Sequence, residues 1–371
     1  MPVQDLHPSV LDLHAQWSDA TRRRPDNVAT SHRFKTPRKL AAGLVNLIAA
    51  VAFTPAASAS EWTLIAIATP APATSIRQAG EAVFFEAGNS YRIVPCVEDR
   101  LCFERDRPPI ETRAAGGIPG GTITEAPGLG IVRASYGAPT ERYPHGVLGD
   151  RIEGGAIEVV DDTGRSIRLV LNQQTVFEDI APRIADIDGD GRNDVVAIRS
   201  DVSAGAGLVV YGMEGPALRE LASIPPIGQP NRWLNVAGIA DFNGDGNIDI
   251  ALVRTPHIGG RLELWTMSGG ALTRMAALDG FSNHVIGSTV LGMSAVADAD
   301  GDGIPDLALP SADRMTFRIM TARSGAWEEI GRVPTTAPIS MAVGVIASNG
   351  SPVFVIGTGA GAVFYAARQE P

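Results

Sequence analysis

The sequence has very little lysine, and this shortage bears on its partners. Among 371 residues there are two lysines, Lys35 and Lys39, and both lie within the first 60 residues. Residues 1–60 carry 7 of the 31 basic and 4 of the 41 acidic residues, which leaves 24 against 37 and a net charge of −13. An acidic chain without lysine is poorly suited to nucleic acid or to an anionic membrane surface. We expect neither partner.

Cysteine is equally rare, which excludes the common structural zinc sites. The two cysteines, Cys96 and Cys102, form no CxxC pair and have no Cys/His zinc spacing. Their six-residue separation would let a disulfide close a small loop between strands, provided that the chain is exported to an oxidising compartment. A pair of free thiols is the alternative.

Several catalytic signatures are also missing. The sequence contains no G-x-S-x-G, no H-E-x-x-H, no P-loop and no dinucleotide fingerprint. Beyond residue 60 no apolar run is long enough to span a bilayer. The sequence therefore gives no motif-based reason to assign an enzyme, although the question of activity stays open.

The first 60 residues resemble an export signal in their composition. A basic cluster (Arg33, Lys35, Arg38 and Lys39) precedes the 14-residue run Leu40–Phe53, and Ala57 and Ala59 then form an A-x-A cleavage pattern. The apolar run is shorter than the roughly 18 to 20 residues of a membrane span. We predict a secretory signal peptide at 32–60, a disordered or mis-started extension at 1–31, and a periplasmic or extracellular protein.

What the sequence does contain is an acidic, glycine-broken stretch that occurs three times. The copies begin at Asp186, Asp241 and Asp298, at intervals of 55 and 57 residues. Oxygen-bearing side chains occupy positions 1, 3, 5 and 9, and glycine occupies position 6, as in a loop that wraps a calcium ion. Position 12 is apolar and a strand-like run follows, so the loops are not EF-hands.

We predict about three calcium sites, one in each loop, because Ca²⁺ prefers six to eight hard oxygen ligands. The position-7 residue of each loop is expected to contribute its main-chain carbonyl. The predicted ligands are Asp186, Asp188, Asp190, Arg192 and Asp194; Asp241, Asn243, Asp245, Asn247 and Asp249; and Asp298, Asp300, Asp302, Ile304 and Asp306. Solvated turns rich in Asp and Gly are the alternative.

A repeated order of strands surrounds these loops. One short apolar strand precedes each loop and three follow it, which predicts four antiparallel strands per unit, the composition of a propeller blade. The fold class is therefore all-β, a β-propeller of six or alternatively seven blades over residues 61–371, clearest at 182–332. A weaker blade, which lacks the acidic loop, is predicted to begin at Arg142. The last unit, from Ile339, has three strands, so we expect the run at 61–69 to supply its outermost strand.

The acidic loops that enter β-strands resemble FG-GAP or VCBS-type repeats. Such repeats build the calcium-bearing β-propeller of integrin alpha subunits and of many bacterial secreted proteins, and the resemblance is specific over residues 182–332. It implies the fold and the calcium ions. Because the family includes adhesins, lectin-like proteins and accessory domains of enzymes, it does not fix the function.

One further group of residues is predicted to lie at the axial end of the propeller, opposite the acidic loops. His257 lies in a loop between two strands, and the other members, which lie near the start of a blade, are His145, Arg183, Trp233, Asn235 and His284. They are either turn and packing residues or a face that binds a sugar or peptide. We thus expect a secreted binding or adhesion module for a carbohydrate or protein ligand. The alternative is an exported hydrolase or lyase with an axial active site.

Overall fold

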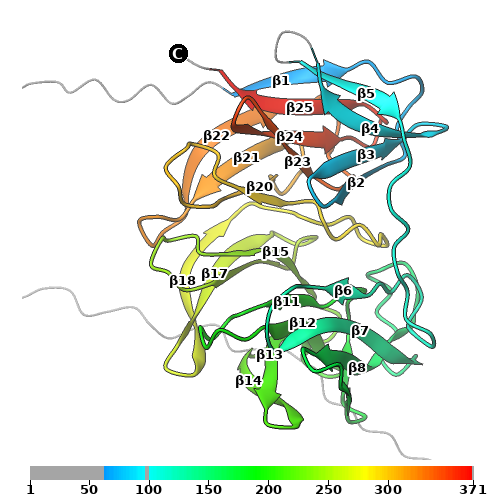
Figure 1. Ribbon diagram of the computed structural model, residues 1–371, viewed down its shortest axis with the longest axis vertical. Coiled ribbons are helices and arrows are strands. Elements are labelled where there is room, and N and C mark those ends of the chain that lie inside the picture. The colour runs from blue at the N-terminus through cyan, green and yellow to red at the C-terminus, as the bar shows by residue number, and fades with distance from the viewer. Residues whose placement is uncertain (1–61, 97–99, 370–371) are drawn as a thin grey trace, which may run out of the picture. The chain divides into compact units, whose positions relative to one another are not determined.

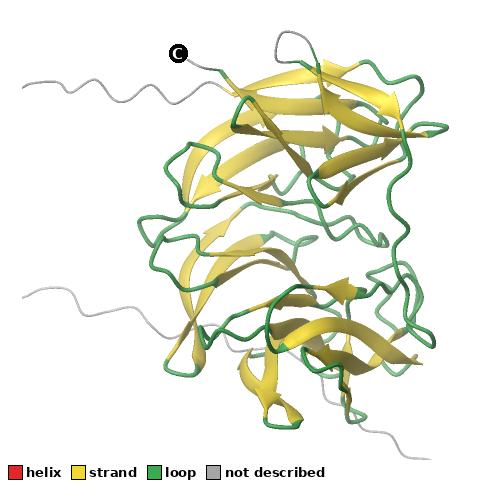
Figure 2. Cartoon of the chain, in the orientation of Figure 1, coloured by secondary structure: helices red, strands yellow, loops and turns green. Residues whose placement is uncertain are grey.

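The computed structural model describes residues 62–96 and 100–369, which form strands, turns and loops without any helix (Figure 2). The predicted signal peptide and the extension before it lie outside the described residues. No described segment forms an apolar helix of the length needed to cross a membrane. The all-β prediction is confirmed.

The three acidic repeats form three antiparallel arrays of four strands each. In every array the acidic loop joins the first strand to the second, as the sequence predicts. The strands are β11 (Arg183–Ala185), β12 (Asp194–Asp201), β13 (Gly205–Glu214) and β14 (Ala217–Ile224); β15 (Leu234–Ala240), β16 (Asp249–Arg254), β17 (Arg261–Ser268) and β18 (Ala271–Asp279); and β19 (Ala295–Ala297), β20 (Asp306–Pro310), β21 (Thr316–Thr321) and β22 (Glu328–Pro334).

The N-terminal part of the chain forms two further groups of strands. The first is a four-stranded sheet in which Cys96 and Cys102 form a disulfide beside the last two strands. Its strands are β2 (Ser75–Ala79), β3 (Ala82–Glu86), β4 (Ser90–Pro95) and β5 (Leu101–Arg105). The second group comprises β6 (Thr124–Glu125), β7 (Ile131–Thr140), β8 (Glu153–Asp161), β9 (Ser166–Val170) and β10 (Thr175–Phe177).

The second group corrects one expectation. The sequence predicts a blade that begins at Arg142, yet residues 142–152 form no strand and the pairing partner of β8 is β7, which ends at Thr140. Gly146 and Gly149 have positive φ values of 71° and 99°, and Pro144 lacks an N–H, so this stretch turns instead of extending. Strand β10 pairs with both β8 and β12 and thereby merges this group with β11–β14 into a nine-stranded sheet. The choice between six and seven blades stays a prediction.

The last sheet closes in the predicted way. It contains β23 (Gly344–Ser348), β24 (Ser351–Gly357), β25 (Val363–Arg368) and β1 (Trp62–Ile67), in the order β1-β25-β24-β23. Strand β1 runs antiparallel to β25 from the pair Trp62/Arg368 to the pair Ile67/Val363, and Figure 1 shows the two strands side by side. The prediction that residues after position 60 complete the last blade is confirmed.

Apolar clusters fill the space between neighbouring sheets. One cluster lies between β6–β9 and β11–β14, and the next two join β11–β14 to β15–β18 and β15–β18 to β19–β22. The last two clusters join β19–β22 to the sheet that contains β1, and that sheet to β2–β5. Within the described residues no such cluster joins β2–β5 to β6–β9. Segment 106–123 connects these two groups, and its Glu111 pairs with Arg77 of β2 at 3.1 Å.

Candidate functional site

Each acidic loop is held in shape by its own first aspartate. In the first loop the two carboxylate oxygens of Asp186 accept hydrogen bonds from the N–H groups of Gly189 and Gly191, both at 2.9 Å. Both glycines have positive φ, 76° and 82°, which side chains disfavour. Asp241 and Asp298 accept the equivalent pairs of bonds in the other two loops. The sequence repeat is therefore a structural repeat.

The ninth position of each loop carries a buried carboxylate. One oxygen of Asp194, Asp249 and Asp306 accepts the N–H of the residue at position 2 of its loop, at 3.0, 3.2 and 2.9 Å. The other oxygens of Asp249 and Asp306 are buried and have no hydrogen-bond partner. Such an oxygen is costly unless a donor or a cation faces it. Burial accordingly raises the pKa of Asp194 to about 7 and those of Asp249 and Asp306 to about 6.

The acidic side chains of two loops converge closely enough to hold a metal ion. Oxygen atoms of Asp186, Asp188 and Asp190 all lie within 4.8 Å of one another, and so do those of Asp298, Asp300 and Asp306. The second loop has Asn243 at position 3, so it presents one carboxylate fewer. Oxygen donors of this kind fit a hard cation such as Ca²⁺.

The remaining predicted ligands are the position-7 residues and the position-5 carboxylates. The N–H groups of Arg192, Asn247 and Ile304 donate to the position-5 carboxylates of their own loops, which are Asp190, Asp245 and Asp302. These bonds orient the ligand-bearing part of each loop. Metal ligation by the main-chain carbonyls of the three position-7 residues stays a prediction.

The third loop also forms ion pairs with an arginine side chain, which the sequence analysis did not predict. Arg323, in the turn after β21, donates to Asp302 at 2.8 Å and lies 3.8 Å from Asp300. The arginine therefore already offsets part of the negative charge of this loop. Only its place in the turn ARSG, at the same end of the blade as the acidic loop, could have indicated this contact.

A second polar group lies in the interior, centred on Glu178. This fully buried carboxylate hydrogen-bonds to His145 Nδ1 and Ser200 Oγ, and the main-chain carbonyl of Glu178 accepts the indole N–H of Trp233 at 2.9 Å. Burial raises the pKa of Glu178, while its contact with His145 acts in the opposite direction. Two of the predicted ligand-face residues, His145 and Trp233, thus meet around an acid that sequence reasoning did not single out.

The two other histidines form a pair beside Trp233. His257 Nε2 lies 2.8 Å from His284 Nδ1, and His284 Nε2 donates to the carbonyl of Ser288 at 2.8 Å. Because His284 donates through Nε2, its Nδ1 accepts from His257 when both rings are neutral. Burial lowers the pKa of each histidine to about 4, so both are neutral at pH 7.

The last two predicted ligand-face residues also have protein partners. Asn235 is fully buried and donates to the carbonyls of Asn283 and Leu291. Arg183 forms an ion pair with the buried Asp179. The six residues are therefore directed toward protein groups, and their contact with an external ligand stays a prediction.

Glu153 gives a testable pH dependence. Its side chain is 2% exposed, and burial together with the nearby Glu178 raises its pKa to about 9. A raised folded-state pKa means that stability falls as the pH rises from about 4.5 to about 9, by about 1.4 kcal/mol for each pH unit. Glu153→Gln should remove this dependence of stability on pH. At pH 8 the variant should have a higher melting temperature than the wild type, as measured by circular dichroism. An unchanged slope in the variant would contradict this assignment.

Comparison with known proteins identifies the repeats. Residues 186–252 and 241–309 each match the family model of the FG-GAP-like repeat, and each match starts at an acidic loop. No curated protein matches the chain. Both matched segments end in the second strand of the following array, so each match extends from one acidic loop through the next.

Solved structures similar to this chain include two lyases and a WD40 domain. Rhamnogalacturonan lyase YesW is 14% identical over 77% of this chain and 58% of its own, with a TM-score of 0.44. The Bacillus licheniformis rhamnogalacturonan lyase PL11 is 14% identical over 82% and 68%, with a TM-score of 0.41. The C-terminal WD40 domain of Sif2 is 10% identical over 81% of this chain and 70% of its own, with a TM-score of 0.39. These likenesses concern the fold alone, and the chain spans little more than half of the first lyase.

Proposed function

Because the chain carries FG-GAP-like repeats over residues 186–309, we propose that it is an exported, calcium-binding β-propeller that acts as a binding or adhesion module. Its ligand in this proposal is a carbohydrate or a protein. The observation that supports calcium most directly is the pair of buried, unpartnered carboxylate oxygens of Asp249 and Asp306. A cation in each loop would supply the missing partner.

Calcium would act here as a structural ion, because the loops also contact neighbouring parts of the ring. Asn193, at position 8 of the first loop, donates to the carbonyls of Pro127 and Leu129 and accepts from the N–H of Ile131. The carbonyl of Asp300 in the third loop accepts a hydrogen bond from Arg368 of β25 at 2.6 Å. Fixing the loops would therefore fix contacts between blades and so the surface that a ligand meets.

Export is supported by two independent features. The segment 32–60 has the composition of a signal peptide, and the disulfide between Cys96 and Cys102 is typical of oxidising compartments. The proposal places the protein in the periplasm or outside the cell.

Calorimetric titration tests the calcium assignment directly. Protein lacking residues 1–60 and stripped with EGTA should bind about three Ca²⁺ ions per chain, one for each acidic loop. Asp188→Ala and Asp300→Ala should each remove one site, because each change deletes a position-3 carboxylate. Asp279→Ala is the control, since this carboxylate is exposed and outside the loops. The absence of binding heat in the wild type would overturn the assignment.

The alternative function is an exported hydrolase or lyase with its active site on the axial face. Its best support is the pair of carboxyl groups, Glu153 and Glu178, because pKa values raised by burial are typical of acid–base catalysts. Both side chains are at most 2% exposed, which favours a structural role. Release of reducing or unsaturated ends from polysaccharides, abolished by Glu178→Gln in a folded variant, would favour the enzyme.

A further inference from the structure

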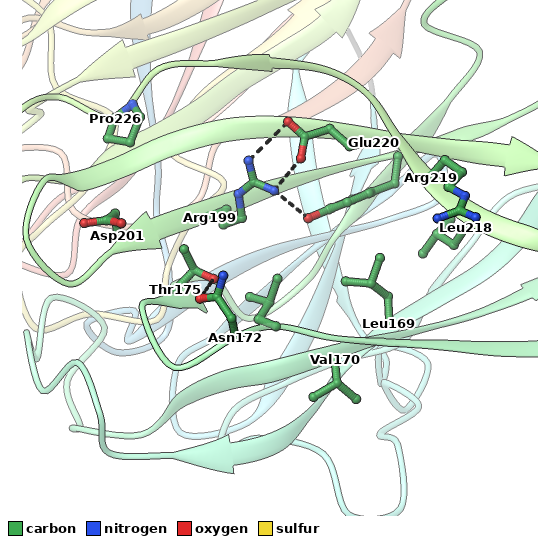
Figure 3. A pocket seen from close by; sticks show the side chains of 12 residues that line it. Leu169, Val170, Asn172, Thr175, Arg199, Asp201, Leu218, Arg219, Glu220 and Pro226 are labelled. Atoms are coloured by element: carbon green, nitrogen blue, oxygen red, sulfur yellow. Dashed lines mark hydrogen bonds and ion pairs between the residues drawn. The ribbon is translucent and has the colours of Figure 1, made fainter.

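A groove of about 580 Å³ opens between β9 and the outer strands of the neighbouring array (Figure 3). Leu169 of β9 points into the groove and forms one wall, whereas the side chain of the next residue, Val170, points away from it and is 66% exposed (Figure 3). The facing wall includes Arg199 of β12 and Glu220 of β14. The groove is separate from the acidic loops and from the buried cluster around Glu178.

The polar wall is built by an arginine that reaches across a strand. Arg199 is paired in register with Gly207 of β13, and its side chain extends across that strand to Glu220 of β14. Its guanidinium donates to both oxygens of Glu220, at 2.6 and 3.2 Å, and to the hydroxyl of Tyr211 at 3.0 Å (Figure 3). A bidentate pair of this kind holds both side chains in a fixed orientation before any ligand arrives.

The ion pair also keeps Glu220 available as an acceptor. Burial raises the pKa of Glu220, but the hydrogen bonds from Arg199 outweigh this effect and lower the pKa overall. The carboxylate is therefore ionised at neutral pH. Three donor hydrogens of the guanidinium point to Tyr211 and Glu220, which leaves further N–H groups of Arg199 for a ligand.

The two other charged groups of the groove, Arg219 and Asp201, have opposite charges. Arg219 lines it and forms no ion pair or hydrogen bond with any residue in the described part of the chain. Asp201 uses one oxygen to accept from Ser203 and Ala204, and its second oxygen has no such partner. Two arginines and two carboxylates give the groove no net charge, with both donors and acceptors exposed.

This combination selects one chemical class of ligand. Neighbouring hydroxyl groups both donate and accept, so a polyhydroxylated molecule can use the donors and the acceptors together. The aliphatic side chain of Leu169 suits the C–H face of a sugar ring. An anionic ligand would bring its charge next to Glu220 and Asp201, which offset the attraction of the two arginines, and an apolar ligand would leave the charged groups unpaired.

We propose that this groove binds a neutral saccharide, with Glu220 and Arg219 as hydrogen-bonding groups and Leu169 against the sugar ring. The inference rests on the proposed binding function and narrows its ligand from carbohydrate or protein to neutral carbohydrate. It assigns the contact to the space between two blades and not to the axial face.

The test uses the chain without residues 1–60 in calcium-containing buffer. A broad array of neutral and acidic oligosaccharides is screened first, and methyl glucoside and methyl glucuronide, which differ in one carboxylate, are then titrated by NMR. We expect neutral array members and the glucoside to bind, with the glucuronide at least tenfold weaker. Glu220→Gln and Leu169→Ala should each weaken the best neutral ligand about tenfold or more. Arg168→Ala, on the same strand but outside the groove, should leave the affinity unchanged.

Each other outcome is decisive, provided that all variants melt like the wild type. If the wild type binds no neutral saccharide but captures a protein ligand, the groove proposal is wrong and the proposed binding function stands. If it binds saccharides with equal affinity in the two groove variants, the sugar site lies elsewhere and the groove assignment is overturned. A preference for the glucuronide would overturn the neutral-ligand assignment.

Discussion

Chelation of calcium is expected to lower the melting temperature of this protein more than any single core substitution. A ligand that binds only the folded state, at 1,000 times its Kd, contributes about 4 kcal/mol per site. Three occupied loops would thus contribute about 12 kcal/mol, and at about 2 °C per kcal/mol for a large domain the loss is about 20 °C. Without the ion, the oxygens of Asp186, Asp188 and Asp190 remain within 4.8 Å of one another, and only backbone N–H groups of the loop and solvent offset their repulsion.

The measurement is a pair of thermal scans, with excess calcium and with excess EDTA. Asp188→Ala and Asp300→Ala should each reduce the difference between the two scans by about a third, because one of three sites is lost. Asp279→Ala, a change in an exposed carboxylate, should retain the full difference. Identical melting of the wild type in both buffers would mean that the acidic loops are ordinary turns.

Deletion of residues 61–69 is expected to destabilise the whole ring. Strand β1 pairs with β25 over six residue pairs, and its Trp62 is buried at 7% exposure against Phe354, with ring centroids 5.7 Å apart. The indole also covers Gly331 of β22, where an added Cβ would lie 2.4 Å from Trp62 Nε1. Losing the strand therefore exposes the edge of β25 and loosens the contact with the neighbouring sheet.

Trp62→Ala separates the packing contribution from the pairing contribution. This change alone should cost about 3–5 kcal/mol, whereas the full deletion should prevent recovery of soluble protein or lower the melting temperature further. Ile65→Ala is the matched control, because Ile65 lies on the same strand and is 38% exposed. A deletion variant that melts within about two degrees of the wild type, which is about 1 kcal/mol of change, would rule out closure by β1.

The parts of the structure that the sequence predicts are those with a local cause. Each acidic loop is specified within nine residues, because Asp186 and its equivalents bond to glycines three and five positions later. Closure by β1 follows from counting strands, since a unit with three strands needs a fourth from elsewhere. The start of a blade at Arg142 was wrong because turn residues interrupt the apolar pattern there.

The cluster around Glu178 could not be predicted in the same way. Its members His145, Ser200 and Trp233 are up to 88 positions apart and meet only when several sheets pack together. The groove at Glu220 has the same origin, because Arg199 reaches that residue across a strand that lies between them. Convergence of side chains from separate blades depends on the finished ring, and no short pattern encodes it.

The pairing of β1 with β25 also sets an order of events during synthesis. Trp62 is made 306 residues before Arg368, its partner in the sheet, an interval of about 15–60 s at ~5–20 residues per second. During this time the apolar segment TLIAI has no native strand beside it, while later blades complete their own four strands from contiguous sequence. Among the described strands, the first to be made thus pairs last, and until then its apolar side chains lack their native neighbours.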